Sequence, residues 1–139
     1  GVTDKRHLFE ELAERAAEIT GRDAAEILEA ITSREELGST GLGNGIAIPH
    51  GKLAGLDGVT ALVARLDEPI DFDSVDDQPV DLVVMLLAPT GAGADHLKAL
   101  SRVARLLRTE TVVDELRRAE GPEQLRTIFT APFATHYAA

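Results

Sequence analysis

One segment of the sequence combines a histidine with residue types that can hold a phosphoryl group: positions 40–52, TGLGNGIAIPHGK. Alternating glycines let backbone N–H groups approach an anion and point at it, as in an anion-binding nest. A neutral imidazole nitrogen at His50, whose approach is fixed by Pro49, could attack phosphorus. The spacing is equally compatible with an ordinary loop histidine beside glycine turns. The donors expected around a phosphoryl group are Thr40, Gly41, Gly43, Asn44 and Gly45.

Two further residues could contribute to the same chemistry. His96 follows Asp95, a candidate helix cap, and the N-terminus of a helix favours a bound anion. Arg34 precedes the glycine segment, and a guanidinium binds phosphate in a bidentate manner. Taken alone, these two residues fit better as a surface histidine and as a solvated arginine beside two glutamates.

Other chemical motifs do not fit the sequence. A P-loop would require glycine at Ile46 and Ser or Thr at Leu53, and the alternating glycines do not match the dinucleotide-binding pattern GxGxxG. No GxSxG nucleophile motif is present, and the four histidines lack metal-ligand spacing. The aspartates between Asp67 and Gln78 do not follow a calcium-loop pattern, so we expect a solvated acidic loop there.

Composition narrows the class of protein. The chain has 139 residues, a formal net charge of -10 and no cysteine, which excludes disulfide and thiolate chemistry. The charge argues against nucleic acid and anionic membranes as partners and favours a partner with a basic face. No apolar run reaches membrane-spanning length, and no N-terminal signal segment is visible, so we expect no membrane insertion and a cytoplasmic location.

Hydrophobic periodicity predicts helices at both ends of the chain. A first helix is expected over 4–20 and a second from a cap at Asp23 to about residue 37, with the apolar stripe of the first at Leu8, Leu12, Ala16 and Ile19. Later helices are expected from Asp95, over 111–119 and from 121–122, and the buried face of the Asp95 helix is expected at Leu97, Leu100, Ala104 and Leu107.

The middle of the chain is predicted to form strands. These are expected over 46–48, ended by Pro49, over 59–66, and over 80–88, which is apolar on both faces and therefore central. Helices flanking a strand-rich middle indicate an α/β layered domain.

The residues around His50 also carry a family resemblance. ITSREELGSTGLGNGIAIPHGK, residues 31–52, resembles the active-site signature of the IIA proteins of the bacterial phosphoenolpyruvate phosphotransferase system, fructose/mannitol class, and is most similar to the nitrogen-regulatory branch. The resemblance continues through EPIDFDSVDDQPVDLVVMLLAP, residues 68–89, and DHLKALSRVARLL, residues 95–107. It therefore covers nearly the whole chain.

The resemblance implies a single IIA-type phosphocarrier domain over residues 1–139, with a mixed central β-sheet and helices on both faces and a loose tail from about residue 131. It implies that His50 accepts a phosphoryl group from an HPr-like carrier, which makes the chain a phosphotransferase component with a phosphohistidine intermediate. His96 aligns with the family's second active-site histidine and Arg34 with its phosphate-binding arginine. No cofactor and no metal are implied.

Three functions remain open at this point. The chain could be a nitrogen-regulatory phosphocarrier, whose targets in similar branches include potassium-transport and sensor-kinase components. It could instead be a sugar-specific IIA protein that passes the phosphoryl group to a IIB domain; the absence of IIB and membrane segments favours the regulatory role. A binding module without transfer is disfavoured because His50, His96 and Arg34 are all present.

Overall fold

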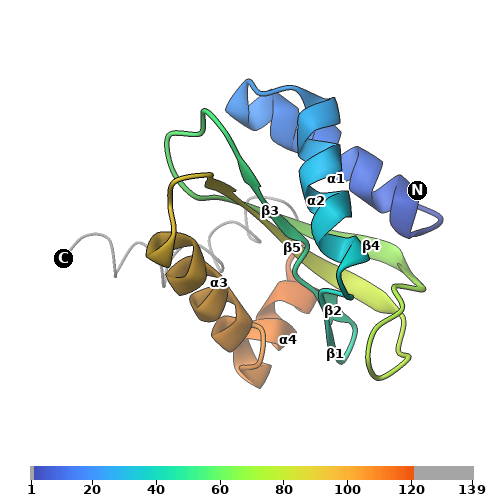
Figure 1. The fold of residues 1–139 in the computed structure, drawn as a ribbon. Coiled ribbons are helices and arrows are strands. Elements are labelled where there is room, and N and C mark those ends of the chain that lie inside the picture. The colour runs from blue at the N-terminus through green and yellow to red at the C-terminus, as the bar shows by residue number, and fades with distance from the viewer. Residues whose placement is uncertain (1, 121–139) are drawn as a thin grey trace.

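The computed structural model describes residues 2–120 and has four helices and five strands within them (Figure 1). The helices are α1 (Lys5–Thr20), α2 (Ala24–Glu36), α3 (Ala94–Leu106) and α4 (Glu110–Arg118). The strands are β1 (Gly41–Gly43), β2 (Ile46–Ala47), β3 (His50–Leu53), β4 (Thr60–Ile70) and β5 (Val80–Pro89). The helix expected from 121–122 and the tail from about 131 lie outside the described residues.

Strand β5 forms the centre of a mixed sheet. It pairs in parallel with β2 and β3 and antiparallel with β4, while β1 pairs antiparallel with β2. Its residues from Leu82 to Ala88 are all buried, as expected for a strand covered on both faces. Strand β4 continues to Ile70 past an irregularity after Arg65, so the expectation of a loop from Asp67 is wrong, and the acidic loop begins only after Ile70.

Strands β2 and β3 form one interrupted line beside β5. Ile46 pairs with Leu82 and His50 with Leu86, which is the same offset on both sides of the break. The carbonyl oxygen of Pro49 accepts a hydrogen bond from the Leu86 N–H at 2.9 Å, so the backbone stays in register although proline has no N–H to donate. The first strand ends before Pro49, as predicted, and the sequence did not predict the second strand, β3, in which pairing resumes at His50.

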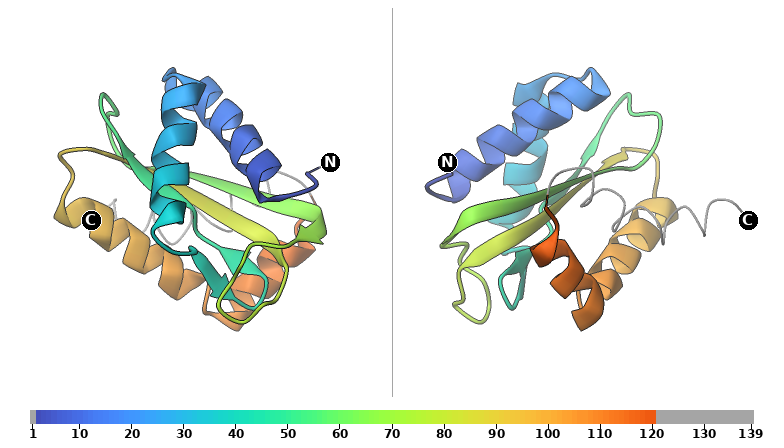
Figure 2. Two further views of the ribbon diagram at one scale, coloured as in Figure 1. Left: turned by 45° about the vertical axis from the view of Figure 1, so that its right-hand side comes forward. Right: turned by 180° about the vertical axis from the view of Figure 1, so that it is seen from behind.

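Helices cover both faces of the sheet, as predicted (Figures 1 and 2). Alternate side chains of β5 point to opposite faces, so Val83, Met85 and Leu87 pack with α1 and α2. Leu82, Val84 and Leu86 pack with α3 and α4 on the other face. The single-domain α/β fold with a mixed sheet is thus confirmed.

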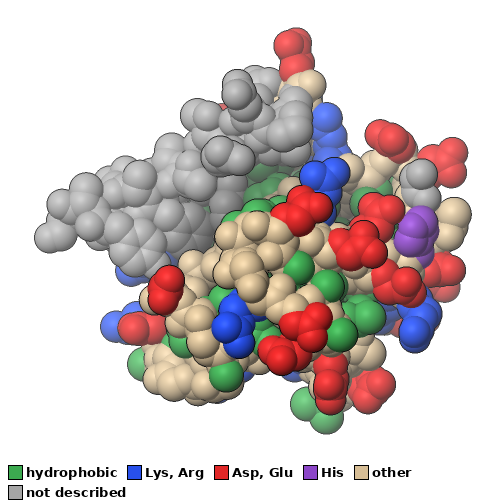
Figure 3. Space-filling model, turned by 90° about the horizontal axis from the view of Figure 1, so that it is seen from above, with side chains coloured by type: hydrophobic (Ala, Val, Ile, Leu, Met, Phe, Trp, Pro, Cys, Tyr) green, Lys and Arg blue, Asp and Glu red, His purple; other side chains and the backbone are tan. Residues whose placement is uncertain are grey.

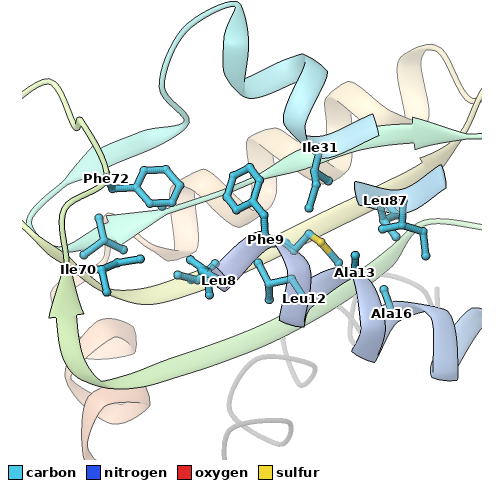
Figure 4. Packing of buried hydrophobic residues seen from close by; sticks show 14 of the residues in the cluster. Leu8, Phe9, Leu12, Ala13, Ala16, Ile31, Ile70, Phe72 and Leu87 are labelled. Atoms are coloured by element: carbon cyan, nitrogen blue, oxygen red, sulfur yellow. The ribbon is translucent and has the colours of Figure 1, made fainter. Parts of the chain in front are cut away.

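The core beneath α1 and α2 shows how the first helix docks. Leu8, Phe9 and Leu12 lie over the sheet in Figure 4, and the rings of Phe9 and Phe72 have centroids 5.9 Å apart. The predicted stripe fails at Ile19, which is 61% exposed in the last turn. Asp4 caps the helix by accepting from the His7 N–H at 2.8 Å, and Gly21 ends it with a φ of 72°.

Helix α3 buries most of the predicted face, because Leu107 is buried and Leu100 and Ala104 pack against the same apolar cluster. Its buried side chains are His96, Ala99 and Val103, whereas Leu97 is 63% exposed. The residue at the N-cap position is Gly93 rather than Asp95, which lies in the first turn. The prediction fails only at Leu97 in the first turn, where His96 occupies the core-facing position. None of the helices in residues 2–120 is long and apolar enough to cross a membrane.

Candidate active site around His50

His50 is the first residue of β3, and its ring orientation is fixed by its own backbone. The Nδ1 atom lies 2.9 Å from the carbonyl oxygen of Ile48. A carbonyl oxygen can only accept, so Nδ1 carries the proton in the neutral ring. Nε2 then holds the lone pair, and the side chain is partly exposed. The geometry therefore presents Nε2 as the nucleophilic atom.

The next residue, Gly51, lets a helix come close to the strand. A Cβ at position 51 would lie 3.1 Å from both the carbonyl carbon and the Cβ of Ala30 in α2. Contacts this short are tighter than ordinary packing allows, so the helix backbone would have to shift. Gly51 thus fixes the distance between α2 and β3.

His96 comes to His50 from the other layer of the fold. It lies in the first turn of α3, is 6% exposed, and its ring centroid is 5.7 Å from that of His50 with the planes tilted by 42°. From the residues alone a surface histidine was favoured, and that interpretation is wrong. Its Nδ1 is buried without a hydrogen-bond partner among the described residues. The first turn of α3 adds the positive end of a helix dipole nearby.

The pKa values of both histidines lie below the usual 6.5. Burial lowers the pKa of His50 most, the Ile48 hydrogen bond opposes it, and smaller effects come from the Arg34 charge, which lowers the pKa, and the Glu35 charge, which raises it. Burial also lowers the pKa of His96, followed by the charges of His50 and Lys52. Both rings are consequently mostly neutral at pH 7, which is the form that a nucleophilic nitrogen requires.

Arg34 and Lys52 supply positive charge around the histidines. Arg34 is in the last turn of α2, where its Nη1 donates to the Gly38 carbonyl oxygen at 2.9 Å. Lys52 follows His50 by two residues in β3, so both side chains leave the same face of the strand. The sequence interpretation missed Lys52 because β3 was not recognised, although strand alternation would have paired it with His50.

Three backbone N–H groups of the glycine segment donate hydrogen bonds to acceptors within the protein. It forms the β1–β2 hairpin, with a turn at Asn44 and Gly45 that have φ values of 56° and 81°. The Asn44 N–H donates to Asp76 at 2.9 Å and the Thr40 N–H donates to Glu35 at 3.1 Å. The Gly41 N–H donates to the Ser39 hydroxyl at 3.1 Å.

The turn of this hairpin is also separated from His50 along the strand. The carbonyl oxygen of Gly45 accepts from the Leu82 N–H, whereas His50 pairs with Leu86. Five residues of extended chain between Gly45 and His50 span roughly 16 Å. A phosphate-binding role of the loop residues stays a prediction that these contacts do not favour.

Two surface hollows lie along α3, and one of them reaches Asp95, the neighbour of His96. One hollow of about 520 Å³ is lined by Val59, Asp95, Lys98 and Arg102, and a smaller one lies farther along α3. Among residues 2–120 no group of three or more histidine, aspartate or glutamate side chains is arranged to hold a metal ion. The groups that the structure brings together here are two imidazoles and the cationic side chains of Arg34 and Lys52.

The sequence matches a described protein family. The model of the family "Phosphoenolpyruvate-dependent sugar phosphotransferase system, EIIA 2" covers residues 1–131. A protein named nitrogen regulatory protein from Bradyrhizobium diazoefficiens is 51% identical over 134 residues, which are 96% of this chain and 88% of the relative. A fructose-specific EIIA component from Haloferax volcanii is 41% identical over 118 residues, which are 85% of this chain and 75% of that protein.

The solved structures that this chain resembles are also IIA proteins. The nitrogen regulatory protein IIA-Ntr from Neisseria meningitidis superposes with a TM-score of 0.85 at 38% identity, covering 91% of this chain and 87% of that one. The mannitol IIA protein from Escherichia coli superposes with a TM-score of 0.72 at 20% identity, covering 91% of this chain and 89% of that one. The second similarity concerns the fold alone.

Proposed function

This chain belongs to the EIIA 2 family of the phosphoenolpyruvate-dependent sugar phosphotransferase system, and we propose that His50 is the residue that carries its phosphoryl group. The chain is a phosphocarrier of the nitrogen-regulatory IIA type, since its relatives of that name include the one at 51% identity. One observation carries the proposal for His50: its Nδ1 is bound to the Ile48 carbonyl at 2.9 Å, which leaves Nε2 as the free nucleophile.

The proposed step is an in-line displacement at phosphorus. The lone pair of His50 Nε2 forms the new N–P bond while the N–P bond to the donor's histidine breaks, and that bonding pair returns to the donor nitrogen. The proton on His50 Nδ1 stays in its hydrogen bond with Ile48 throughout. The electron-rich carbonyl oxygen also stabilises the positive charge that the ring acquires as the new bond forms.

His96 and Arg34 are proposed to hold the phosphoryl oxygens. His96 lies next to His50 at a ring-centroid distance of 5.7 Å, and a neutral imidazole can donate one hydrogen bond. Arg34 already influences the pKa of His50 through its charge, and a guanidinium can turn from the exposed Gly38 carbonyl to a phosphoryl group. Preorganised donors of this kind stabilise the charge on the transferring group.

The partners proposed for this site are proteins. The donor is an HPr-like phosphocarrier, and the receivers are regulatory target proteins in the cytoplasm or a IIB domain. Acidic side chains are spread over the face shown in Figure 3, and the chain carries a net charge of -10. This charge would speed the encounter with a partner that has a basic face. A sugar-specific role is the less supported alternative, because the fructose-specific relative is 41% identical and the nitrogen-regulatory one is 51% identical.

Intact mass spectrometry after incubation with phosphoenolpyruvate, the upstream kinase and the HPr-like carrier tests this proposal. We expect one acid-labile phosphoryl adduct on the wild type and none on His50→Ala. His7→Ala is the matched control, since His7 lies on α1 with its ring 39% exposed. An adduct on His50→Ala would overturn the assignment of the acceptor. A wild type without an adduct from several cognate carriers would favour a binding module that does not transfer.

A further inference from the structure

A continuous series of contacts leads from helix α1 to the ring of His50. It begins at Lys5, passes through Glu35 in α2 and Thr40 before β1, and reaches the peptide of Ile48. The last contact is the hydrogen bond between Ile48 and the Nδ1 atom of His50. The series thus links helix α1 with the segment from Glu35 to His50, behind the nucleophile.

Glu35 is the charged member of this series that is hardest to reach from water. Its side chain is 7% exposed, and its carboxylate lies 2.7 Å from the Lys5 Nζ. The same carboxylate accepts the Thr40 N–H at 3.1 Å and the Thr40 hydroxyl at 2.5 Å. Lys5 is held in turn by the carbonyl oxygen of Phe72 at 3.2 Å. A buried carboxylate with this many partners fixes the position of Thr40 firmly.

Thr40 holds the backbone of Ile48 in place, and Ile48 in turn holds the ring of His50. The carbonyl oxygen of Thr40 accepts from the Ile48 N–H at 3.0 Å, and the Ile48 carbonyl oxygen accepts from His50 Nδ1 at 2.9 Å. Thr40 and Ile48 are 7% and 2% exposed, so little water can replace either hydrogen bond. The N–H and the carbonyl of Ile48 belong to adjacent peptide units, so the buried backbone at Ile48 links Thr40 to the nitrogen of His50 that keeps the proton.

We propose that Glu35 is a positioning residue for His50, acting through Thr40 and Ile48 to keep the proton on Nδ1 and the lone pair on Nε2. This role rests on the proposed function of His50 as the phosphoryl acceptor. Glu35 touches neither the donor nor the transferring group. It acts because the tautomer with the proton on Nε2 has no lone pair there with which to attack phosphorus.

Loss of the carboxylate has a defined physical consequence. Without Glu35 the Thr40 N–H and hydroxyl lose their buried acceptor, and the segment around Thr40 must move to find water or another partner. The backbone of Ile48 then moves with Thr40, and the hydrogen bond between the Ile48 carbonyl oxygen and His50 Nδ1 weakens. Both neutral tautomers of the ring become populated, and the fraction of His50 that is ready to react falls.

The test compares Glu35→Ala, Glu35→Gln and the matched control Asp81→Ala. The control also removes a carboxylate from an ion pair, because Asp81 lies 3.0 Å from Arg117, at the opposite end of β5 from His50. Long-range ¹H–¹⁵N spectra of the full chain report the tautomer of His50 without any phosphoryl donor. Single-turnover transfer from the phosphorylated HPr-like carrier reports the rate.

We expect wild type and Asp81→Ala to hold His50 with the proton on Nδ1. In Glu35→Ala we expect a mixture of tautomers and a transfer rate that is roughly tenfold lower, since small displacements of a reacting group are costly. Glu35→Gln keeps an oxygen acceptor for Thr40 and should recover part of both. If Glu35→Ala does not fold, Thr40→Val removes the hydroxyl bond alone and is expected to act in the same direction.

A single Nδ1-protonated tautomer in Glu35→Ala, or in Thr40→Val where the former does not fold, would overturn the positioning role. A wild-type ring protonated on Nε2 would overturn it as well. These outcomes are separate from the failure of the proposed function. A wild type that accepts no phosphoryl group removes the acceptor role of His50, whatever its tautomer.

Discussion

The Nδ1 atom of His50 lies 2.9 Å from the carbonyl oxygen of Ile48, two residues earlier in the chain. Pro49 between them cannot donate a hydrogen bond, yet its own carbonyl oxygen holds the Leu86 N–H at 2.9 Å. Proline thus removes one N–H from the pairing with β5, and at this point the ring of His50 binds the carbonyl oxygen of Ile48. This local geometry leaves Nε2 available for chemistry.

Removal of the charge of Arg34 should change His50 in two ways. We expect the pKa of His50 to rise in Arg34→Gln, because the positive charge that disfavours the imidazolium is lost. Transfer to His50 should slow by roughly 100-fold if Arg34 binds the phosphoryl oxygens. NMR titration and single-turnover kinetics measure the two effects, with the exposed Arg15→Gln as control. An unchanged pKa together with an unchanged rate would exclude Arg34 from the site.

The buried histidine should make stability depend on pH. The folded pKa of His96 lies below its unfolded value of 6.5, so the folded chain binds fewer protons than the unfolded chain near pH 6. This contribution to stability is complete above pH 6.5 and is lost as the pH falls through the folded pKa. Urea unfolding at pH 7.5 and pH 5 should therefore show a smaller loss in His96→Gln than in the wild type.

The control for this comparison is Leu97→Gln, a change in the same turn of α3 at a side chain that is 63% exposed and does not titrate. It should lose as much stability between the two pH values as the wild type does. An equal loss in His96→Gln and the wild type would show that His96 does not contribute to the dependence.

The contact between Gly51 and α2 predicts a stability defect. In Gly51→Ala the new Cβ would lie 3.1 Å from the carbonyl carbon of Ala30, so the helix must move. Overpacking of this kind costs about 1–3 kcal/mol. Gly58→Ala is the matched control, because a Cβ there has nothing within 4 Å. Urea unfolding measures the stability of the two variants. Equal stability would mean that α2 moves without a loss of folding free energy.

Much of the fold could be predicted from the sequence, because its strongest patterns are local. Helix α1 begins after Asp4 and ends before Gly21, and both are strong boundary residues. The apolar run in β5 indicated a strand buried on both faces, and the structure places it at the centre of the sheet. His50 was singled out for its place after the glycines and Pro49, and the family resemblance gave it a role.

The predictions failed where a residue at the site also occupies a core position, and where a contact depends on the tertiary fold. His96 occupies a core position of α3, so treating it as a surface residue placed the exposed Leu97 on the predicted apolar face. Strand β3 was missed because Pro49 stands directly before it, and pairing with β5 cannot be deduced from the short sequence HGKL. Glu35 meets Thr40 where the chain turns from α2 towards β1, and it meets Lys5 of α1 only through the tertiary fold, which leaves no periodic signal.

The most direct test of the central claim is NMR spectroscopy of the phosphorylated chain with ¹⁵N-labelled histidine, in which ³¹P–¹⁵N coupling identifies the bonded nitrogen. The account predicts a single N–P bond at His50 Nε2, with the proton still on Nδ1. An N–P bond at His50 Nδ1, or on His96, would contradict it, because the Ile48 carbonyl would then not be selecting the reacting atom.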